Sequence, residues 1–309
     1  MTIKINMTKY KNYGRCVELS NGKIKALITV DIGPRIIFYG TADGRNVMLE
    51  DIEREVSSGG AYFDKNFTAG ERWYIYGGHR MWKAPEDDAS YVPDNYPVKY
   101  ILGDNFSEFF PPVQTNTRFC FKIRVSMSEN GALTVVHTME NLGSVTANVA
   151  VWALTVLRPG GAEIIPLNTT DTGFLPNNYF SYWPYNDIND KRLTGIDGYL
   201  LLKQDKDIKR AFKLGTLNKK GFAAYGVDGL LFIKKFPYIN GAVYPDNNCN
   251  FETYTNNLFL EMETLSPLCA VEPGGSISHT EEFMLFEQIL DTKTLLLDKF
   301  FTDKTKEQI

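Results

Sequence analysis

The sequence predicts an all-β fold, a sandwich or barrel of mostly antiparallel strands. Three observations support this prediction: short segments alternate apolar and polar residues, turn-forming residues separate them, and amphipathic helices do not intervene. The run CVELSNGKIKALITVDIGPRIIFYGTADGRNVML is divided by an Asn-Gly pair, a Gly-Pro break and an Asp-Gly pair. Two-residue Asn-Gly and Asp-Gly links favour tight hairpins, so this stretch is predicted to be an antiparallel meander.

The same pattern returns along the chain. RFCFKIRVSMSENGALTVVHTMEN alternates across an Asn-Gly pair, and GFAAYGVDGLLFIKKF does so across an Asp-Gly pair. Further runs that resemble strands are GYLLLKQD, RAFKLGTL and NFETYTNNLFLEMETLSPL. Near the C-terminus, TKTLLLDKFFTDK has helical spacing with Asp291 as its N-cap, and we expect a short helix there that covers a sheet edge or face. Since no repeat or linker is evident, we expect a single domain over residues 1–309.

Composition excludes several classes of function. The chain has 33 Lys and Arg against 37 Asp and Glu, a net charge of −4, which argues against a nucleic-acid partner. It has no apolar run of signal-peptide or membrane-span length, so we expect a cytoplasmic protein with no membrane partner. The four cysteines form no CxxC pair, so we expect reduced thiols and no metal site. No nucleotide-binding, serine-hydrolase or zinc-protease motif is present, so we expect no cofactor. We expect the protein to be a monomer or a homodimer.

Two long segments, about 62–112 and about 167–193, have weak periodicity and are rich in Gly, Pro, Asp and aromatic residues. Loops of that length in a compact domain are usually functional. The first contains YGGHRMWKAPE, which places His79 beside Arg80, Trp82 and Glu86 after two glycines that let the backbone bend closely around a ligand. This composition is typical of a pocket lining, although an aromatic-rich turn with a structural histidine also explains it.

The other two histidines are predicted to be structural. His137 lies within the alternating run ALTVVHTME, where we expect its ring to find a hydrogen-bond partner in the fold. His279 follows a Pro-Gly-Gly turn in SISHTEEF. Neither lies in a cluster of polar and aromatic residues like that around His79.

A second cluster of functional candidates is acidic. Successive side chains of a strand alternate between its faces, so Glu261 and Glu263 are expected to project together with Phe259, and Glu252 to share a face with Tyr254. Carboxylates on strands fit for burial are costly unless they are paired or used. Buried carboxyls with raised pKa values suit general acid-base catalysis, whereas a solvated outer face explains the same alternation more simply.

Five further residues are candidate sugar contacts. Aromatic rings and cations of this kind can hold a saccharide, although Trp and Tyr are as often core residues. They are Trp152, Trp183, Tyr244, Arg35 and Lys213.

The C-terminal third resembles the end of the aldose 1-epimerases, or galactose mutarotases. FETYTNN, FLEMETLSPL and EPGGSISHTEEFML follow the order of that family's Tyr-Thr-Gly-Asn turn, Leu-Glu-Thr-Gln strand and Pro-Gly-Glu turn. The order of IGPRI, GGHRMWKAPE and NVAVWALTVLRPGG before them extends the likeness over residues 32–285. The chain is therefore similar to a divergent branch of the galactose mutarotase-like superfamily.

The resemblance implies a β-supersandwich with a carbohydrate cleft on its concave sheet. In that family a glutamate removes the proton of the anomeric hydroxyl while a histidine donates to the ring oxygen. Glu261 matches the position of the glutamate, Glu263 falls where the family has Gln, and His79 is the best candidate for the histidine. The second histidine of the family's NHxYFNL segment is missing from VAVWALTVL, where Trp152 stands.

We therefore expect a carbohydrate-binding isomerase that interconverts sugar anomers, with Glu261 as base and His79 as acid. The cations Arg80, Arg35 and Lys213 exceed what a neutral sugar needs, which favours an anionic sugar or a pocket without catalysis. The alternative is a non-catalytic module that binds or senses a saccharide. A polysaccharide lyase or hydrolase is disfavoured, because the sequence lacks the extra catalytic domain that such lyases usually carry.

Overall fold

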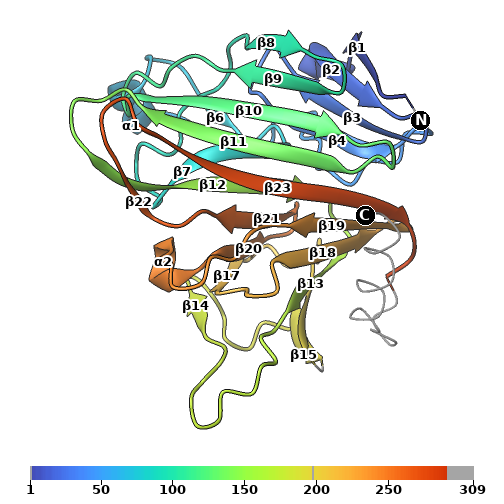
Figure 1. The fold of residues 1–309 in the computed structure, drawn as a ribbon, viewed down its shortest axis with the longest axis vertical. Helices are drawn as coiled ribbons and strands as arrows, with labels where there is room; N and C mark the ends of the chain where they lie inside the picture. Colours follow the sequence, from blue (N-terminus) through green and yellow to red (C-terminus); the bar gives the residue numbers. More distant parts are fainter. Residues whose placement is uncertain (1, 197, 291–309) are drawn as a thin grey trace.

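The computed structural model describes residues 2–196 and 198–290, and its main feature is a pair of large antiparallel sheets that pack face to face (Figure 1). Within these residues the larger sheet has 11 strands, the smaller sheet has 10, and a separate ribbon has two. The predicted all-β, mostly antiparallel sandwich is confirmed. Among the described residues no helix is long and apolar enough to cross a membrane.

The larger sheet combines strands from both ends of the chain. In spatial order its strands are β1 (Lys4–Lys9), β2 (Arg15–Ser20), β3 (Ile24–Thr29), β4 (Ile36–Thr41), β7 (Gly78–Ala84), β12 (Ala147–Leu157), β21 (Leu260–Leu265), β20 (Phe251–Thr255), β17 (Phe212–Thr216) and β14 (Phe180–Tyr182), and β22 (Cys269–Val271) also pairs with β12.

The smaller sheet is assembled from strands that are similarly far apart in the sequence. Its spatial order is β15 (Leu193–Ile196), β16 (Tyr199–Lys203), β13 (Ala162–Pro166), β18 (Phe222–Val227), β19 (Leu230–Lys235), β23 (Ser276–Glu287), β11 (Leu133–Asn141), β10 (Phe119–Met127), β9 (Phe106–Phe110) and β8 (Lys99–Leu102). The remaining elements are the ribbon of β5 (Ser57–Ser58) and β6 (Trp73–Tyr74), the helices α1 (Ala61–Asn66) and α2 (Pro245–Asn248), and a 3₁₀ turn at Lys11–Tyr13.

Three of the expected hairpin turns join paired strands, whereas the Asp43-Gly44 turn after β4 is followed only by isolated bridges. Strands β2, β3 and β4 form an antiparallel meander, with the Asn21-Gly22 turn between the first two. The Asn130-Gly131 turn joins β10 to β11, and the Asp228-Gly229 turn joins β18 to β19. The C-terminal helix predicted after Asp291 lies outside the described residues.

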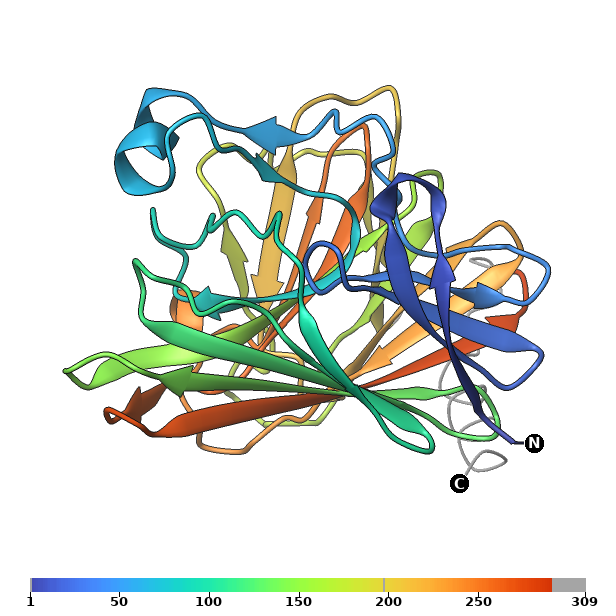
Figure 2. The ribbon, with the colours of Figure 1, turned by 90° about the horizontal axis from the view of Figure 1, so that it is seen from above.

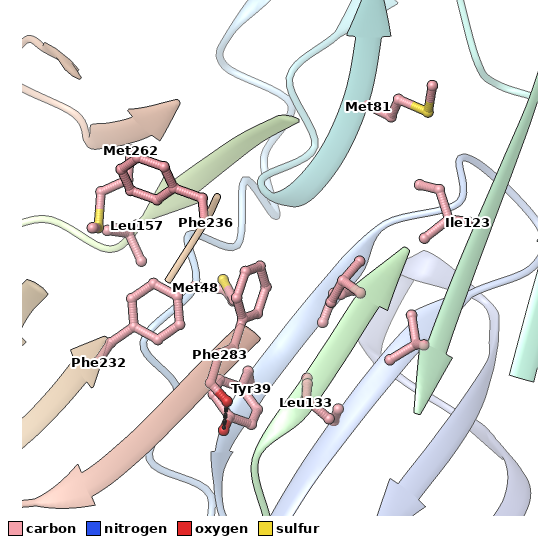
Figure 3. Packing of buried hydrophobic residues seen from close by; sticks show 14 of the residues in the cluster. Tyr39, Met48, Met81, Ile123, Leu133, Leu157, Phe232, Phe236, Met262 and Phe283 are labelled. Carbon is pink, nitrogen blue, oxygen red and sulfur yellow. Dashed lines mark hydrogen bonds between the residues drawn. The ribbon is translucent and has the colours of Figure 1, made fainter. Parts of the chain in front are cut away.

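The hydrophobic core fills the space between the two sheets. Phe283 of β23 lies at its centre, with its ring 5.2 Å from that of Phe232 and 6.3 Å from that of Tyr39 (Figure 3). The hydroxyl of Tyr39 donates a hydrogen bond of 3.1 Å to the carbonyl oxygen of Phe283, so the larger sheet is tied to the smaller one. Met81 of β7 points into the same layer as Ile123 of β10.

Strands β7, β12 and β21 lie side by side in the larger sheet, and every second side chain on them points away from this core. The ribbon of β5 and β6 and the helix α1 lie outside the two sheets, on one side of the molecule (Figure 2). Ser58 and Trp73 of the ribbon line one hollow together with outward side chains of β7 and β21, and Tyr62 and Phe63 of α1 line a second hollow that also includes Ser58. The outer face of the larger sheet is therefore covered by the long segments that the sequence marked as loops.

Candidate functional site

A cavity of about 240 Å³ lies on the outer face of the larger sheet. Charged groups line it together with a wall of aromatic rings. The charged residues are Arg80, Glu86, Lys213, Glu261 and Glu263. The aromatic residues are Trp73, Trp82, Tyr91, Trp152, Tyr185, Tyr254 and Phe259.

Strand alternation places the two glutamates in this cavity. Glu261 and Glu263 of β21 line it together with Phe259, whereas Leu260 and Met262 belong to the core between the sheets. The prediction that the glutamates share one face of this strand is confirmed. The alternative, that this face is open to solvent, is wrong, since Glu261 is 7% and Glu263 is 1% exposed.

Glu261 is a buried carboxyl that forms an ion pair with Arg80. Its Oε1 lies 3.3 Å from Nη1 of Arg80, and the Arg80 guanidinium lies 4.5 Å from the ring centroid of Trp82. Burial raises the pKa of Glu261 to about 7; Arg80 opposes this rise and the charge of Glu263 adds to it. A carboxyl with such a pKa exchanges its proton readily near neutral pH.

Lys213 of β17 is held by two carboxylates on the neighbouring strands. Its Nζ lies 2.9 Å from Oε2 of Glu263 and 2.8 Å from Oε2 of Glu252. Burial acts against the charged lysine, but the two carboxylates outweigh it and raise its pKa. The indole Nε1–H of Trp152 donates 2.8 Å to the same Glu263 oxygen, so the Glu263 carboxylate is fixed from two sides.

The cavity continues outward into a second hollow of about 590 Å³, which we call the vestibule. Residues common to both hollows are Ser58, Glu86, Tyr91 and Lys213. The rest of the vestibule is lined by Tyr62, Phe63, Asp87, Asp88, Trp183 and Asp246. Trp183 thus lies in the vestibule, where the Nζ of Lys213 is 4.7 Å from its ring centroid.

His79 lies on the opposite face of the larger sheet from Glu261, so the expected acid-base pair does not form. Its neighbour Arg80 points into the cavity, while the His79 ring points between the sheets and is fully buried. There its Nε2 lies 2.7 Å from Nε2 of His137, and its Nδ1 lies 2.9 Å from Oγ1 of Thr155. The sequence placed His79 in a loop, but β7 is a strand and its neighbouring residues face opposite ways.

The hydrogen bonds around His79 follow one direction. The carbonyl of His279 can only accept, so the Nδ1–H of His137 donates to it over 3.1 Å. A neutral His137 then accepts from Nε2–H of His79, whose bare Nδ1 accepts from the hydroxyl of Thr155. Lys234 donates to the Thr155 hydroxyl over 2.9 Å, which starts the chain. Burial, followed by the neighbouring His137, holds the pKa of His79 well below 6.5 and keeps it neutral.

His79 and His137 lie close to the carboxylate of Glu281, and together the three side chains have the chemistry of a cation site. One ligand atom each of His79, His137 and Glu281 lie within 4.8 Å of one another. The ammonium of Lys234, however, already lies 2.8 Å from the carboxylate of Glu281 and supplies the positive charge there. This cluster is therefore a hydrogen-bonded polar layer inside the core, and a second cation beside Lys234 would be repelled.

Three other predicted contacts lie outside the cavity. Arg35 is fully buried and lies 2.6 Å from a carboxylate oxygen of Asp94. Tyr244 is a core residue whose hydroxyl accepts from the backbone N–H of Ile239. Glu252 forms an ion pair with Lys213 but does not itself line the cavity.

Five aromatic residues of the cavity wall were not among the candidate contacts; Tyr254 and Phe259 were expected only to share a face with the glutamates, and the other three were not singled out at all. Trp73 and Tyr91 fall within the first long segment, and Tyr185 falls within the second. Their signal was the composition of those segments as a whole. Nothing in the local sequence separates them from the other aromatic residues nearby.

Comparison with solved structures identifies the fold. A galactose mutarotase-like protein from Lactobacillus casei matches with a TM-score of 0.56 and 14% identity, over 88% of this chain and all of that one. A second galactose mutarotase-like protein, from Clostridium acetobutylicum, matches with a TM-score of 0.55 and 12% identity, over 93% of this chain and 99% of that one. A candidate aldose 1-epimerase from Klebsiella pneumoniae matches with a TM-score of 0.59 and 10% identity, over 92% of this chain and 83% of that one. No family model and no curated protein sequence matches the chain significantly.

Proposed function

We propose that the chain binds the ring of a saccharide in the cavity of the larger sheet, and that Glu261 exchanges a proton with its anomeric hydroxyl, as in an aldose 1-epimerase. The galactose mutarotase-like fold supports a carbohydrate-related protein. The observation that carries the proposal is a buried glutamate with a pKa of about 7 inside an aromatic cavity. Near pH 7 such a group can both take up and return a proton.

The size and walls of the cavity suit one sugar ring. Its volume of about 240 Å³ is below the range of about 300–1,000 Å³ that is typical of drug-sized ligands. Trp82 and Trp152 contribute apolar ring surface to the cavity wall for the C–H side of a sugar, and the charged groups beside them can bond its hydroxyls. Such a wall combines stacking with directed hydrogen bonds.

The charges favour a neutral sugar over the anionic one that the sequence suggested. Arg80 is already paired with Glu261, and Lys213 is already paired with Glu252 and Glu263. An incoming phosphate or carboxylate would have to compete with these carboxylates and would be repelled by them. The two cations therefore hold the glutamates in place rather than await an anion.

The proposed reaction opens and recloses the sugar ring. Glu261 removes the proton from O1, the electrons form the C1–O1 double bond, and the bond from C1 to the ring oxygen breaks. The ring oxygen takes a proton from a cavity hydroxyl. On closure the ring oxygen attacks either face of C1 and returns its proton to that hydroxyl, while the protonated Glu261 returns its proton to O1, so either anomer forms and the site is restored. Tyr185 and Tyr254 carry phenol groups whose pKa burial raises, so both are protonated donors along this cavity.

Anomer exchange tests this proposal directly. NMR magnetisation transfer would be recorded with neutral aldoses, hexose phosphates and uronic acids, and faster exchange is expected for a neutral aldose. Glu261→Gln should abolish the acceleration while calorimetry still detects the sugar. Glu282→Gln, at a half-exposed site on the smaller sheet, is the matched control and should leave exchange unchanged. Undiminished exchange in Glu261→Gln would remove the assignment of the base.

One observation favours a second candidate, a saccharide-binding module without catalysis. All three histidines of the chain lie in the polar layer between the sheets, so none can serve as the acid that the aldose 1-epimerase resemblance implies. A module of this kind would bind a sugar in calorimetry and leave its anomer exchange at the uncatalysed rate. The exchange experiment therefore separates the two candidates.

A further inference from the structure

We infer that the site takes a neutral saccharide of at least two units, with the reducing-end ring in the cavity and the next ring in the vestibule. This inference rests on the proposed function and extends it. It starts from the continuity of the two hollows, which share Lys213, Tyr91 and two other lining residues. The vestibule is the larger hollow, at about 590 Å³ against about 240 Å³.

Lys213 marks the boundary between the two ring positions. Its Nζ lies 4.7 Å from the ring centroid of Trp152 and 4.7 Å from that of Trp183. Trp152 lines the cavity and Trp183 lines the vestibule, so each compartment receives one indole beside the shared lysine. An indole in each compartment gives each sugar ring its own stacking partner.

The vestibule has a second aromatic wall, which is held in position. The ring of Tyr62 lies 5.8 Å from that of Phe63 in an edge-to-face contact, and its hydroxyl donates 2.9 Å to the carbonyl oxygen of Asp88. Tyr62 is nevertheless 42% exposed. A large aromatic side chain that is fixed but open to solvent is a ready surface for a ligand.

The charge of the vestibule selects against anions. Glu86, Asp87, Asp88 and Asp246 line it, and the cation that lines it, Lys213, is already paired with two buried carboxylates. Lys83 compensates one of the four through its ion pair with Asp87. The remaining excess of negative charge repels a uronate, sulfate or phosphate on the second unit, whereas hydroxyl groups can donate to these carboxylates.

The experiment compares sugars that differ in the second unit alone. Calorimetry would be run with glucose against maltose, cellobiose and lactose, which all have glucose at the reducing end, and with galactose against galactobiose. At least one disaccharide is expected to bind about tenfold more tightly than its monosaccharide, the range of an aromatic contact. Cellobiouronic acid should bind more weakly than cellobiose.

Trp183→Ala should remove most of the gain for the disaccharide and leave the affinity for the monosaccharide within about threefold of the original, since one stacking contact of about tenfold is lost. Phe174→Ala is the control, since that ring is fully exposed in the same long segment and lines neither hollow.

If a monosaccharide binds and no disaccharide binds more tightly, the second ring position does not exist, while the proposed function stands. If Trp183→Ala weakens both sugars equally, the vestibule is not a separate position. If no saccharide binds at all, both proposals fail.

Discussion

Replacing Glu261 by Gln measures how strongly the cavity perturbs this carboxyl. Its pKa rises from an ordinary 4.5 to about 7 in the folded protein. Between these values the folded state holds a proton that the unfolded state has lost, so the free energy of unfolding falls as the pH rises from about 4.5 to about 7. One pKa unit is worth about 1.4 kcal/mol, so the whole loss amounts to about 3 kcal/mol.

Glu261→Gln cannot lose a proton, so its stability relative to the original protein should improve by about 3 kcal/mol between pH 4.5 and pH 8. Urea unfolding followed by circular dichroism at several pH values measures this difference. The control Glu282→Gln changes a carboxyl that is 44% exposed beside Lys235 and therefore screened by water, so its difference should vary less over this range than that of Glu261→Gln. A difference for Glu261→Gln that changes by less than about 1 kcal/mol over this range would refute the elevated pKa and weaken the case for Glu261 as the base.

Three further predictions concern the framework of the site. Lys213→Met leaves two buried carboxylates without their cation and should cost about 3–5 kcal/mol in urea unfolding at pH 7; a loss below about 1 kcal/mol would show that water reaches them. Gly78→Ala should lower the melting temperature more than Gly70→Ala, because both have positive φ but only the Cβ at Gly78 would lie 2.4 Å from a backbone oxygen; equal losses would contradict this reasoning. Since burial holds the pKa of His79 well below 6.5, stability due to its neutral ring is lost as the pH falls below 6.5, and His79→Gln should give a flatter unfolding profile between pH 7.5 and 5 than the original protein.

The parts of the fold and site that sequence reasoning predicted depend on local periodicity. Glu261 and Glu263 are two residues apart on a strand, so their common face follows from the pleat alone. The hairpins likewise follow from Asn-Gly and Asp-Gly pairs between alternating runs. Such features need no knowledge of what packs above or below the strand.

The errors come from residues whose role depends on tertiary structure. The adjacency of His79 and Arg80 in a segment rich in Gly and aromatic residues predicts one cluster, but both lie on strand β7, whose alternation points them to opposite faces of the sheet. Arg35 has the chemistry of a sugar contact, but its partner Asp94 comes from a distant loop and buries it. Tyr185 lines the cavity because its loop folds back over the larger sheet, and no local sequence pattern predicts this placement.

The place of β21 and β23 in the two sheets has a consequence for how the protein is made. β21 fills the gap between β12 and β20, and β23 fills the gap between β11 and β19. At roughly 5–20 residues per second, synthesis of the hundred or so residues between β12 and β21 takes on the order of 5–20 s. During that time β12 presents Trp152 on an open strand edge, the kind of surface to which other chains add. The edge of β12 that pairs with β21 in the folded protein is therefore without its partner strand until β21 has emerged from the ribosome.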